Sequence, residues 1–157
     1  MLDILIGISL YLICELFAYL WHRFVSHDDL IPVLHDFHKG HHENSEKDND
    51  FLFVLFAVII LGIFSICLTN LNIISVYYSV FILITILILF IYNWLLHLSY
   101  HNENNVLNYF NWFELERQRH QMHHINPKIN YGITCHLFDK LFGTWIESPF
   151  SNYLNSV

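Results

Sequence analysis

The chain has 157 residues, of which 55% are hydrophobic and 13% charged, with a formal net charge of -7 and a mean hydropathy of +0.40. This length suits one domain, and the composition excludes both a disordered chain and an ordinary soluble domain, in which about a quarter of the residues are charged. The seven Lys and Arg residues are too few for a nucleic-acid binder, which neutralises phosphates with basic side chains. The three cysteines, Cys14, Cys67 and Cys135, are widely spaced, so we predict neither a disulfide framework nor a thiolate zinc site.

Three apolar stretches are long enough to cross a bilayer, which takes a helix of about 20 residues. They cover about residues 1–21, 51–69 and 73–96. The first contains Asp3 and Glu15, whereas the other two carry no charge. The short Asn-containing link between the last two predicts a tight helical hairpin. We therefore predict an all-α integral membrane bundle that forms a single domain over residues 1–157, with about three to four transmembrane helices.

Two polar blocks, residues 22–50 and 97–157, remain between and after these stretches, and they hold all seven basic residues. Because two predicted spans separate the blocks, both lie on the same side of the membrane. The positive-inside rule places that side in the cytosol, so the blocks are expected to form a cytosolic, histidine-rich helical cap. The first stretch lacks a basic start and a small-residue cleavage site, so it is predicted to stay as an anchor.

Histidine is the unusual residue of this chain: it occurs 12 times, and ten of the copies fall into four short motifs. On a helix, residues i, i+3 and i+4 share a face, so the three histidines of each HxxHH motif are expected to converge. Residues five apart diverge on a regular helix, so one member of the HxxxxH pair is expected just beyond a helix end. The motifs are His22-x-x-x-x-His27, His38-x-x-His41-His42, His97-x-x-x-His101 and His120-x-x-His123-His124.

Neutral imidazole is a common ligand for zinc, iron, copper and nickel. Ten histidines are too many for a closed structural zinc site with four ligands. They would instead supply two metals with about five nitrogens each and leave positions open for a small molecule. The absence of ExxH and HExxH from the sequence excludes soluble di-iron bundles and zinc metalloproteases. A histidine-rich interfacial patch without metal is the alternative.

Three further residues have two interpretations each. His136 and His35 are expected to be ordinary polar residues, although His35 lies three residues before His38 and so shares its helix face as a candidate supporting residue. Asp139 either orients a histidine through the ring nitrogen that faces away from the metal or belongs to a turn. Residues 106–115 either lie in the headgroup layer, where Trp and Tyr concentrate, or pack as a helix over the histidines.

From His22 to Trp145 the sequence resembles the fatty acid hydroxylase/sterol desaturase superfamily of integral-membrane oxygenases. The resemblance rests on the four histidine motifs and on two later segments, Asn130-Tyr131-Gly132 and the run from Phe138 to Thr144. The spacing of the histidine motifs most resembles the fatty acid 2-hydroxylase branch.

This resemblance implies a centre of two iron ions, with zinc able to replace iron in purified protein, and O2 as co-substrate. The activity implied is hydroxylation of a lipid acyl chain taken from the bilayer. Electrons would come from a separate donor such as cytochrome b5 or ferredoxin, since no cytochrome b5-like domain is fused, and no nucleic-acid partner is expected. The implied metal ligands are His22, His27, His38, His41, His42, His97, His101, His120, His123 and His124.

Two alternatives to acyl hydroxylation remain open. One is a carotenoid or sterol hydroxylase or desaturase of the same superfamily, and the other is a non-catalytic metal-binding membrane scaffold. The expected location is a multi-pass position in the endoplasmic reticulum membrane for a eukaryotic or viral protein and in the cell membrane for a bacterial one, with the active site on the cytosolic face.

Overall fold

The computed structural model describes residues 2–28, 30–43 and 51–149, and within this part every regular element is a helix. The all-α prediction is therefore confirmed for the described residues. In chain order the elements are α1 (Leu2–Leu20), the π-helix η1 (Trp21–Ser26), α2 (Pro32–Glu43), α3 (Phe51–Asn70), α4 (Val76–Tyr100), the 3-10 helix η2 (Val106–Tyr109), α5 (Asn111–Ile125) and α6 (Leu137–Phe142).

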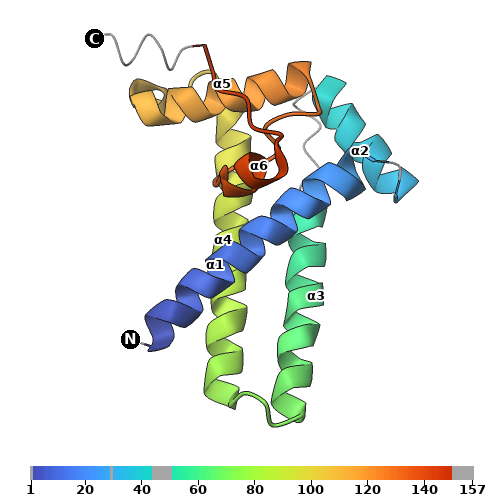
Figure 1. Cartoon of the computed structure of the whole chain (residues 1–157), viewed down its shortest axis with the longest axis vertical. Helices are drawn as coiled ribbons and strands as arrows, with labels where there is room; N and C mark the ends of the chain where they lie inside the picture. The colour runs from blue at the N-terminus through green and yellow to red at the C-terminus, as the bar shows by residue number, and fades with distance from the viewer. Residues whose placement is uncertain (1, 29, 44–50, 150–157) are drawn as a thin grey trace.

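Helices α3 and α4 form the predicted hairpin and run antiparallel along their length (Figure 1). The connection turns at Asn72, whose φ of 56° lies in the left-handed region that Asn tolerates better than most residues. Ser75 then caps α4, because its side chain accepts a hydrogen bond from the backbone N–H of Tyr78. Between the helices, the hydroxyls of Ser65 and Ser79 pair at 3.1 Å, so neither buried hydroxyl lacks a partner.

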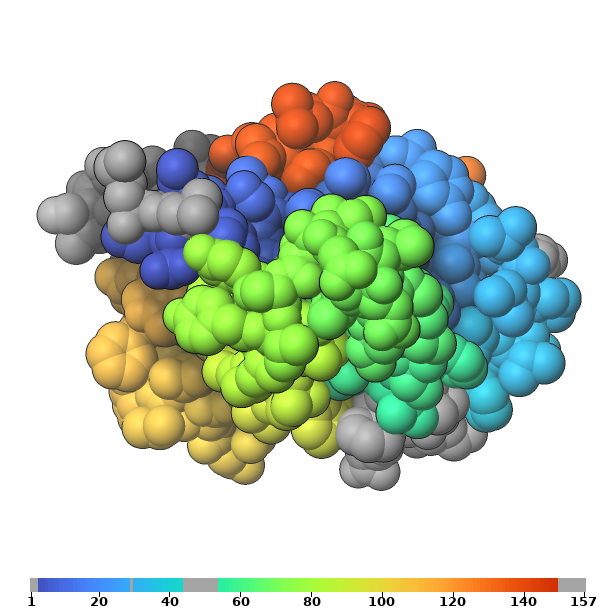
Figure 2. All heavy atoms as spheres, turned by 90° about the horizontal axis from the view of Figure 1, so that it is seen from below, coloured from blue at the N-terminus to red at the C-terminus, as the bar shows by residue number. Residues whose placement is uncertain are grey.

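Helix α1 lies between this hairpin and α6, as the view from below shows (Figure 2). It contributes Cys14 to a buried apolar cluster completed by Val54 and Ala57 of α3 and by Ile86 and Phe90 of α4. On its other side, Tyr19 packs against Tyr131 and Phe138 in a second cluster. The N-terminal helix is thus held by the hairpin and by the C-terminal part of the chain.

Two segments of the described chain are long and apolar enough to cross a membrane, Asp3–Ser26 and Val76–Tyr100. Only 17% and 28%, respectively, of their most apolar windows are buried in the fold, unlike the mostly buried core helix of a soluble protein. Within α3 the apolar stretch Val54–Asn70 is shorter, at the lower limit for a span. The count of three to four spans therefore stays a prediction.

The histidine-bearing elements gather at the end of α4 opposite the α3–α4 turn, where α5 lies across the helix end and α2 lies nearby (Figure 1). The two predicted polar blocks thus meet at one end of the bundle. Residues 44–50 and 150–157 of these blocks lie outside the described residues.

Candidate metal centre

The ten motif histidines form two groups of five, and within each group one nitrogen per ring lies within 4.8 Å of the others. We call them the first and the second histidine group. The first consists of His22, His27, His38, His42 and His123, and the second of His41, His97, His101, His120 and His124.

Each HxxHH motif divides its histidines between the two groups. His38 and His42 of α2 belong to the first group, whereas His41 belongs to the second. In α5 the middle histidine, His123, likewise joins the group opposite to that of its neighbours. The expectation that all three histidines of a motif converge was wrong, because on an α-helix positions i and i+4 are nearly in line, whereas position i+3 lies on the other side of i.

The HxxxxH pair is aligned by a π turn. Residues Trp21–Ser26 form the π-helix, and His27 is the residue just beyond it, as the sequence led us to expect of one member of the pair. A π turn contains more residues than an α turn, so residues five apart lie closer to one line. The ring centroids of His22 and His27 are 5.0 Å apart, close to the 5.1 Å between His97, in the last turn of α4, and His101, the residue that caps this helix.

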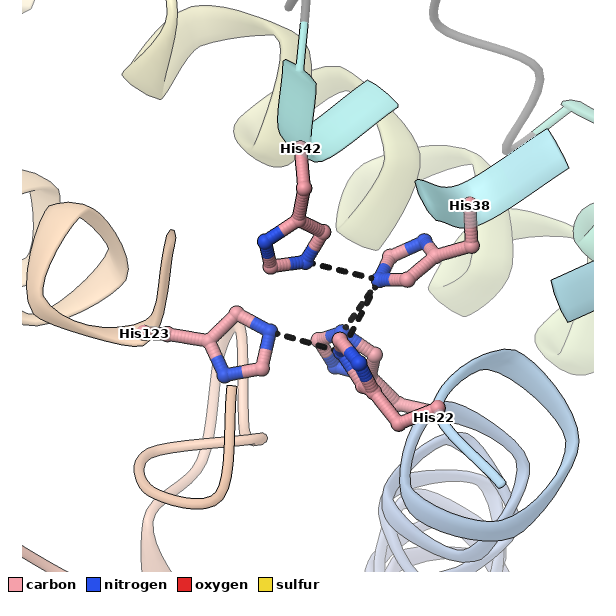
Figure 3. A group of neighbouring side chains, drawn as sticks. His22, His38, His42 and His123 are labelled. Carbon is pink, nitrogen blue, oxygen red and sulfur yellow. Dashed lines mark hydrogen bonds between the residues drawn. The ribbon is translucent and has the colours of Figure 1, made fainter. Parts of the chain in front are cut away.

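In each group, one nitrogen of every ring lies near the corresponding nitrogens of the other four. In the first group, Nε2 of His38 lies 3.1 Å from that of His22, 3.0 Å from that of His27 and 3.1 Å from that of His42 (Figure 3). Nε2 of His123 lies 3.0 Å from that of His27.

The second group has the same arrangement around His120, whose Nε2 lies 3.0 Å from that of His97, 2.9 Å from that of His101 and 3.0 Å from that of His124. Two ligand nitrogens at right angles, each about 2.1 Å from a metal ion, would be about 3.0 Å apart. The donor sets of both groups therefore fit a metal ion with five imidazole ligands.

Ring orientation in the first group is fixed by backbone carbonyls. Nδ1 of His22 donates to the carbonyl of Tyr131 at 2.6 Å, and Nδ1 of His123 donates to that of Ile129 at 2.7 Å. A neutral imidazole that donates through Nδ1 has a bare lone pair on Nε2. Both rings therefore turn the lone pair of Nε2 toward the other histidines of the group, which is the orientation that a metal ion bound there requires.

The rings of α5 are held neutral by their surroundings. Burial, followed by the nearby His97, His124 and His101 rings, lowers the pKa of His120 well below its usual value. Burial and the neighbouring His42 ring lower the pKa of His124 to about 2. Neutral imidazole is the form that ligates metals, so these rings need lose no proton at neutral pH in order to bind one.

One loop, residues 129–134, supports both groups. It supplies the Ile129 and Tyr131 carbonyls to the first group, and its Ile133 carbonyl accepts a hydrogen bond from the Tyr100 hydroxyl at 3.0 Å. The Tyr100 ring in turn lies against that of His120 in the second group, with centroids 5.5 Å apart.

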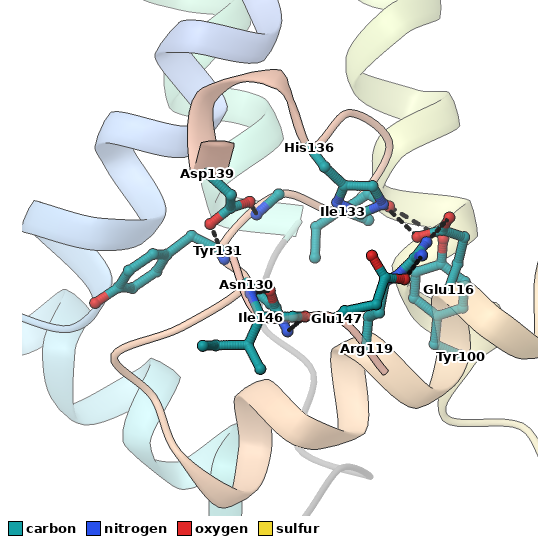
Figure 4. Close-up of polar contacts among 11 residues, drawn as sticks. Tyr100, Glu116, Arg119, Asn130, Tyr131, Ile133, His136, Asp139, Ile146 and Glu147 are labelled. Atoms are coloured by element: carbon teal, nitrogen blue, oxygen red, sulfur yellow. Dashed lines mark hydrogen bonds and ion pairs between the residues drawn. The ribbon is translucent and has the colours of Figure 1, made fainter. Parts of the chain in front are cut away.

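Asp139, which is fully buried, holds this loop in place. Its carboxylate accepts hydrogen bonds from the backbone N–H groups of Tyr131 (Figure 4) and Gly132, both at 2.8 Å. It also accepts one from the hydroxyl of Thr144 at 2.7 Å. A Cβ at residue 132 would clash with the Cys135 carbonyl and lie 2.8 Å from Asp139 Oδ2, so only glycine fits. The two C-terminal segments singled out in the sequence thus meet to build the support of the histidines.

Asn130 completes the support of the loop with φ of 51°. Its side chain donates to the Ile146 carbonyl at 3.0 Å and accepts from the Ile146 N–H at 2.9 Å. Asp139 does not touch the ring of His22. It accepts a hydrogen bond from the N–H of the Tyr131–Gly132 peptide, whose carbonyl in turn orients His22, so it lies one step further from the ring than the orienting role considered from the sequence.

The remaining sequence candidates lie outside the two groups. His35 has its Nδ1 atom 3.7 Å from the carboxylate of Asp36, and His136 bonds to Glu116. Sequence reasoning missed the supporting roles of Ile129, Tyr131 and Tyr100. Two of these roles belong to backbone carbonyls, for which no side-chain pattern exists.

These features define an all-helical protein with two five-histidine groups at one end of an apolar bundle. A family model described as fatty acid hydroxylase matches residues 7–144. The chain belongs to the fatty acid hydroxylase family, which implies an oxidoreductase of the lipid hydroxylase or desaturase type. No curated protein and no solved structure matches the chain.

Proposed function

We propose that this protein is an O2-dependent lipid hydroxylase that binds one iron ion in each histidine group and acts on a fatty acyl chain, at carbon 2. The observation that carries the proposal is the convergence of five imidazole nitrogens in each of two adjacent groups in a chain of this family. The groups adjoin: the rings of His42 and His124, one from each, stack with centroids 4.1 Å apart.

Bound iron would supply the two-electron reduction of O2, with one oxygen atom entering a C–H bond of the lipid and the other leaving as water after two protons are taken up. The electrons would come from a separate donor such as cytochrome b5 or ferredoxin. The chain's own part is to hold the ions, through the ten histidines, and to fix their rings, through the loop at residues 129–134 and Asp139.

We further propose that the protein crosses the membrane several times, with the histidine groups at the cytosolic face. The apolar segments Asp3–Ser26 and Val76–Tyr100 support this arrangement. A lengthened α3–α4 turn bearing a glycosylation acceptor should be modified, whereas an acceptor placed after Pro149 should not. Modification after Pro149 would reverse the proposed topology.

The reaction is tested in cells that express the protein together with a cytochrome b5-type donor under 18-O2. We expect 2-hydroxy fatty acids that carry one labelled oxygen, and His38→Ala should abolish them. Label in sterols or carotenoids alone would assign the protein to those substrates. If the protein is fully loaded with iron and no lipid carries label, the protein would be assigned as a non-catalytic metal-binding scaffold.

A further inference from the structure

A pocket lies between α1, α4 and the loop that supports the histidines. Three histidines line it, His22 and His38 of the first group and His97 of the second, together with Glu15 and Asn93. A molecule bound in this pocket would therefore touch both groups. Along the helices, Asn93 precedes His97 by four residues and Glu15 precedes His22 by seven, so the two polar side chains lie roughly one to two helical turns from the rings.

Glu15 is unusual in its position. It is the carboxylate in the middle of the apolar segment Asp3–Ser26, and its exposed fraction is 8%. Ionisable groups within apolar helices of this kind are costly and commonly mark functional sites. The other buried residues of this helix, Cys14 and Tyr19, belong to apolar clusters, and Glu15 belongs to neither cluster.

Glu15 ends a directed chain of hydrogen bonds. Asn93 Nδ2 donates to Thr134 Oγ1 at 3.2 Å, and the Thr134 hydroxyl donates to Glu15 Oε1. Asn93 and Thr134 are both donors in this chain, so its free end is an acceptor. Among the described residues, none donates a hydrogen bond to the second carboxylate oxygen of Glu15.

We propose that Glu15, positioned by Thr134 and Asn93, is a recognition site for an uncharged hydrogen-bond donor on the lipid, a hydroxyl or an amide N–H. This inference rests on the proposed function and narrows its substrate class. A carboxylate acceptor favours donors and repels the anionic head of a free fatty acid. The preferred substrate therefore carries a hydroxyl or an amide N–H close to the carbon that reacts.

The test is a binding measurement that needs no turnover. The iron-loaded full chain in lipid nanodiscs is titrated in the absence of oxygen with N-methyl hexadecanamide and, separately, with methyl hexadecanoate. The two probes differ only in that the amide has an N–H group where the ester has an oxygen atom. We expect the amide to bind at least about tenfold more tightly, as a hydrogen bond to a charged acceptor gives. Equal affinities for the two probes would overturn the proposal.

Substitutions at Glu15 test whether the preference for the amide over the ester depends on this residue. Glu15→Leu should bring the two dissociation constants together, whereas Ser65→Ala, which removes a polar group from the α3–α4 contact away from the pocket, should keep the full preference. If Glu15→Leu does not fold, Glu15→Gln decides, because it retains an acceptor for Thr134 but has no charge. We expect Glu15→Gln to retain about a threefold preference.

A preference that survives Glu15→Leu, or that stays full in Glu15→Gln, would mean that Glu15 only clamps α1 to the loop, and it would overturn the inference. The outcome is independent of the labelled-oxygen experiment. Selective binding without labelled product would contradict the proposed function alone, and labelled product with equal binding would contradict this inference alone.

Discussion

The two histidine groups reach the same ligand set through different backbones. Each combines a pair that follows an apolar helix, positions i and i+4 of one HxxHH motif, and the middle histidine of the other motif. The first group aligns its leading pair with a π turn, whereas the second places its pair at the end of a regular α-helix, with His97 in the last turn of α4 and His101 as its C-cap. The number and direction of the donor atoms are thus the common requirement, and the local helix type is adapted to it.

The groups also differ in what holds their rings. Backbone carbonyls of Ile129 and Tyr131 fix two rings of the first group, whereas in the second group His120 rests against the Tyr100 ring. Because each group includes one histidine from the other half of the chain, neither half contains a complete group.

The largest effect is expected from His41 and His123, the one histidine of each group that comes from the other half of the chain. His41→Ala should remove the ion of the second group, although His38 and His42 on the same helix belong to the first, and His123→Ala should remove the ion of the first group. Each variant should bind about one ion instead of two and lose at least tenfold in labelled-oxygen product. Metal analysis of folded protein checks this, and a wild type with at most one tightly bound ion would refute it.

Asp139→Asn should weaken the first group selectively. An amide has one acceptor oxygen where the carboxylate has two, so at least one of the bonds to Tyr131, Gly132 and Thr144 is lost and the carbonyl that orients His22 moves. We expect an about 10- to 100-fold loss of metal affinity in the first group and a smaller loss in the second, which the loop supports only through Tyr100. Competition with a chelator measures it, with Glu114→Gln on α5 as the control, and equal losses in both groups would contradict selectivity.

Tyr100→Phe tests the support of the second group with a smaller change. The variant keeps the ring against His120 but removes the hydroxyl that donates to Ile133, and a buried hydrogen bond of this kind contributes about 1 kcal/mol. Thermal unfolding in detergent should show that loss. Metal affinity should fall only a few-fold, and in the second group. A loss of metal affinity confined to the first group would show that Tyr100 does not support His120.

His35→Ala should have the smallest effect. His35 belongs to neither group, so the bound metal and the oxygenated product should stay at the wild-type level. A drop to one ion per chain would show that the variant loses a ligand or its support, and would require a sixth histidine in one of the groups.

The amino-acid sequence was sufficient to predict the all-helical class, the α3–α4 hairpin and the ten histidines that make up the two groups. Apolar run length and residue type are local properties, so these features follow from patterns within short windows. The spacing of His22 and His27 also indicated a break in the regular helix. The motif Asn130-Tyr131-Gly132 pointed to the right loop, although only through a family resemblance.

How the ten histidines are divided between the two groups could be seen only in the folded chain. Whether His41 faces the first group or the second depends on how α2 sits against α4 and α5, and no periodicity within α2 contains that information. The same holds for the carbonyls of Ile129 and Tyr131, because every residue has a carbonyl and only the path of the loop, set by Asp139, brings these two to the rings. The same is true of the hydrogen bonds at Glu15. Thr134 donates to Glu15 and Asn93 donates to Thr134, and these three residues are far apart in the sequence and meet only in the folded chain.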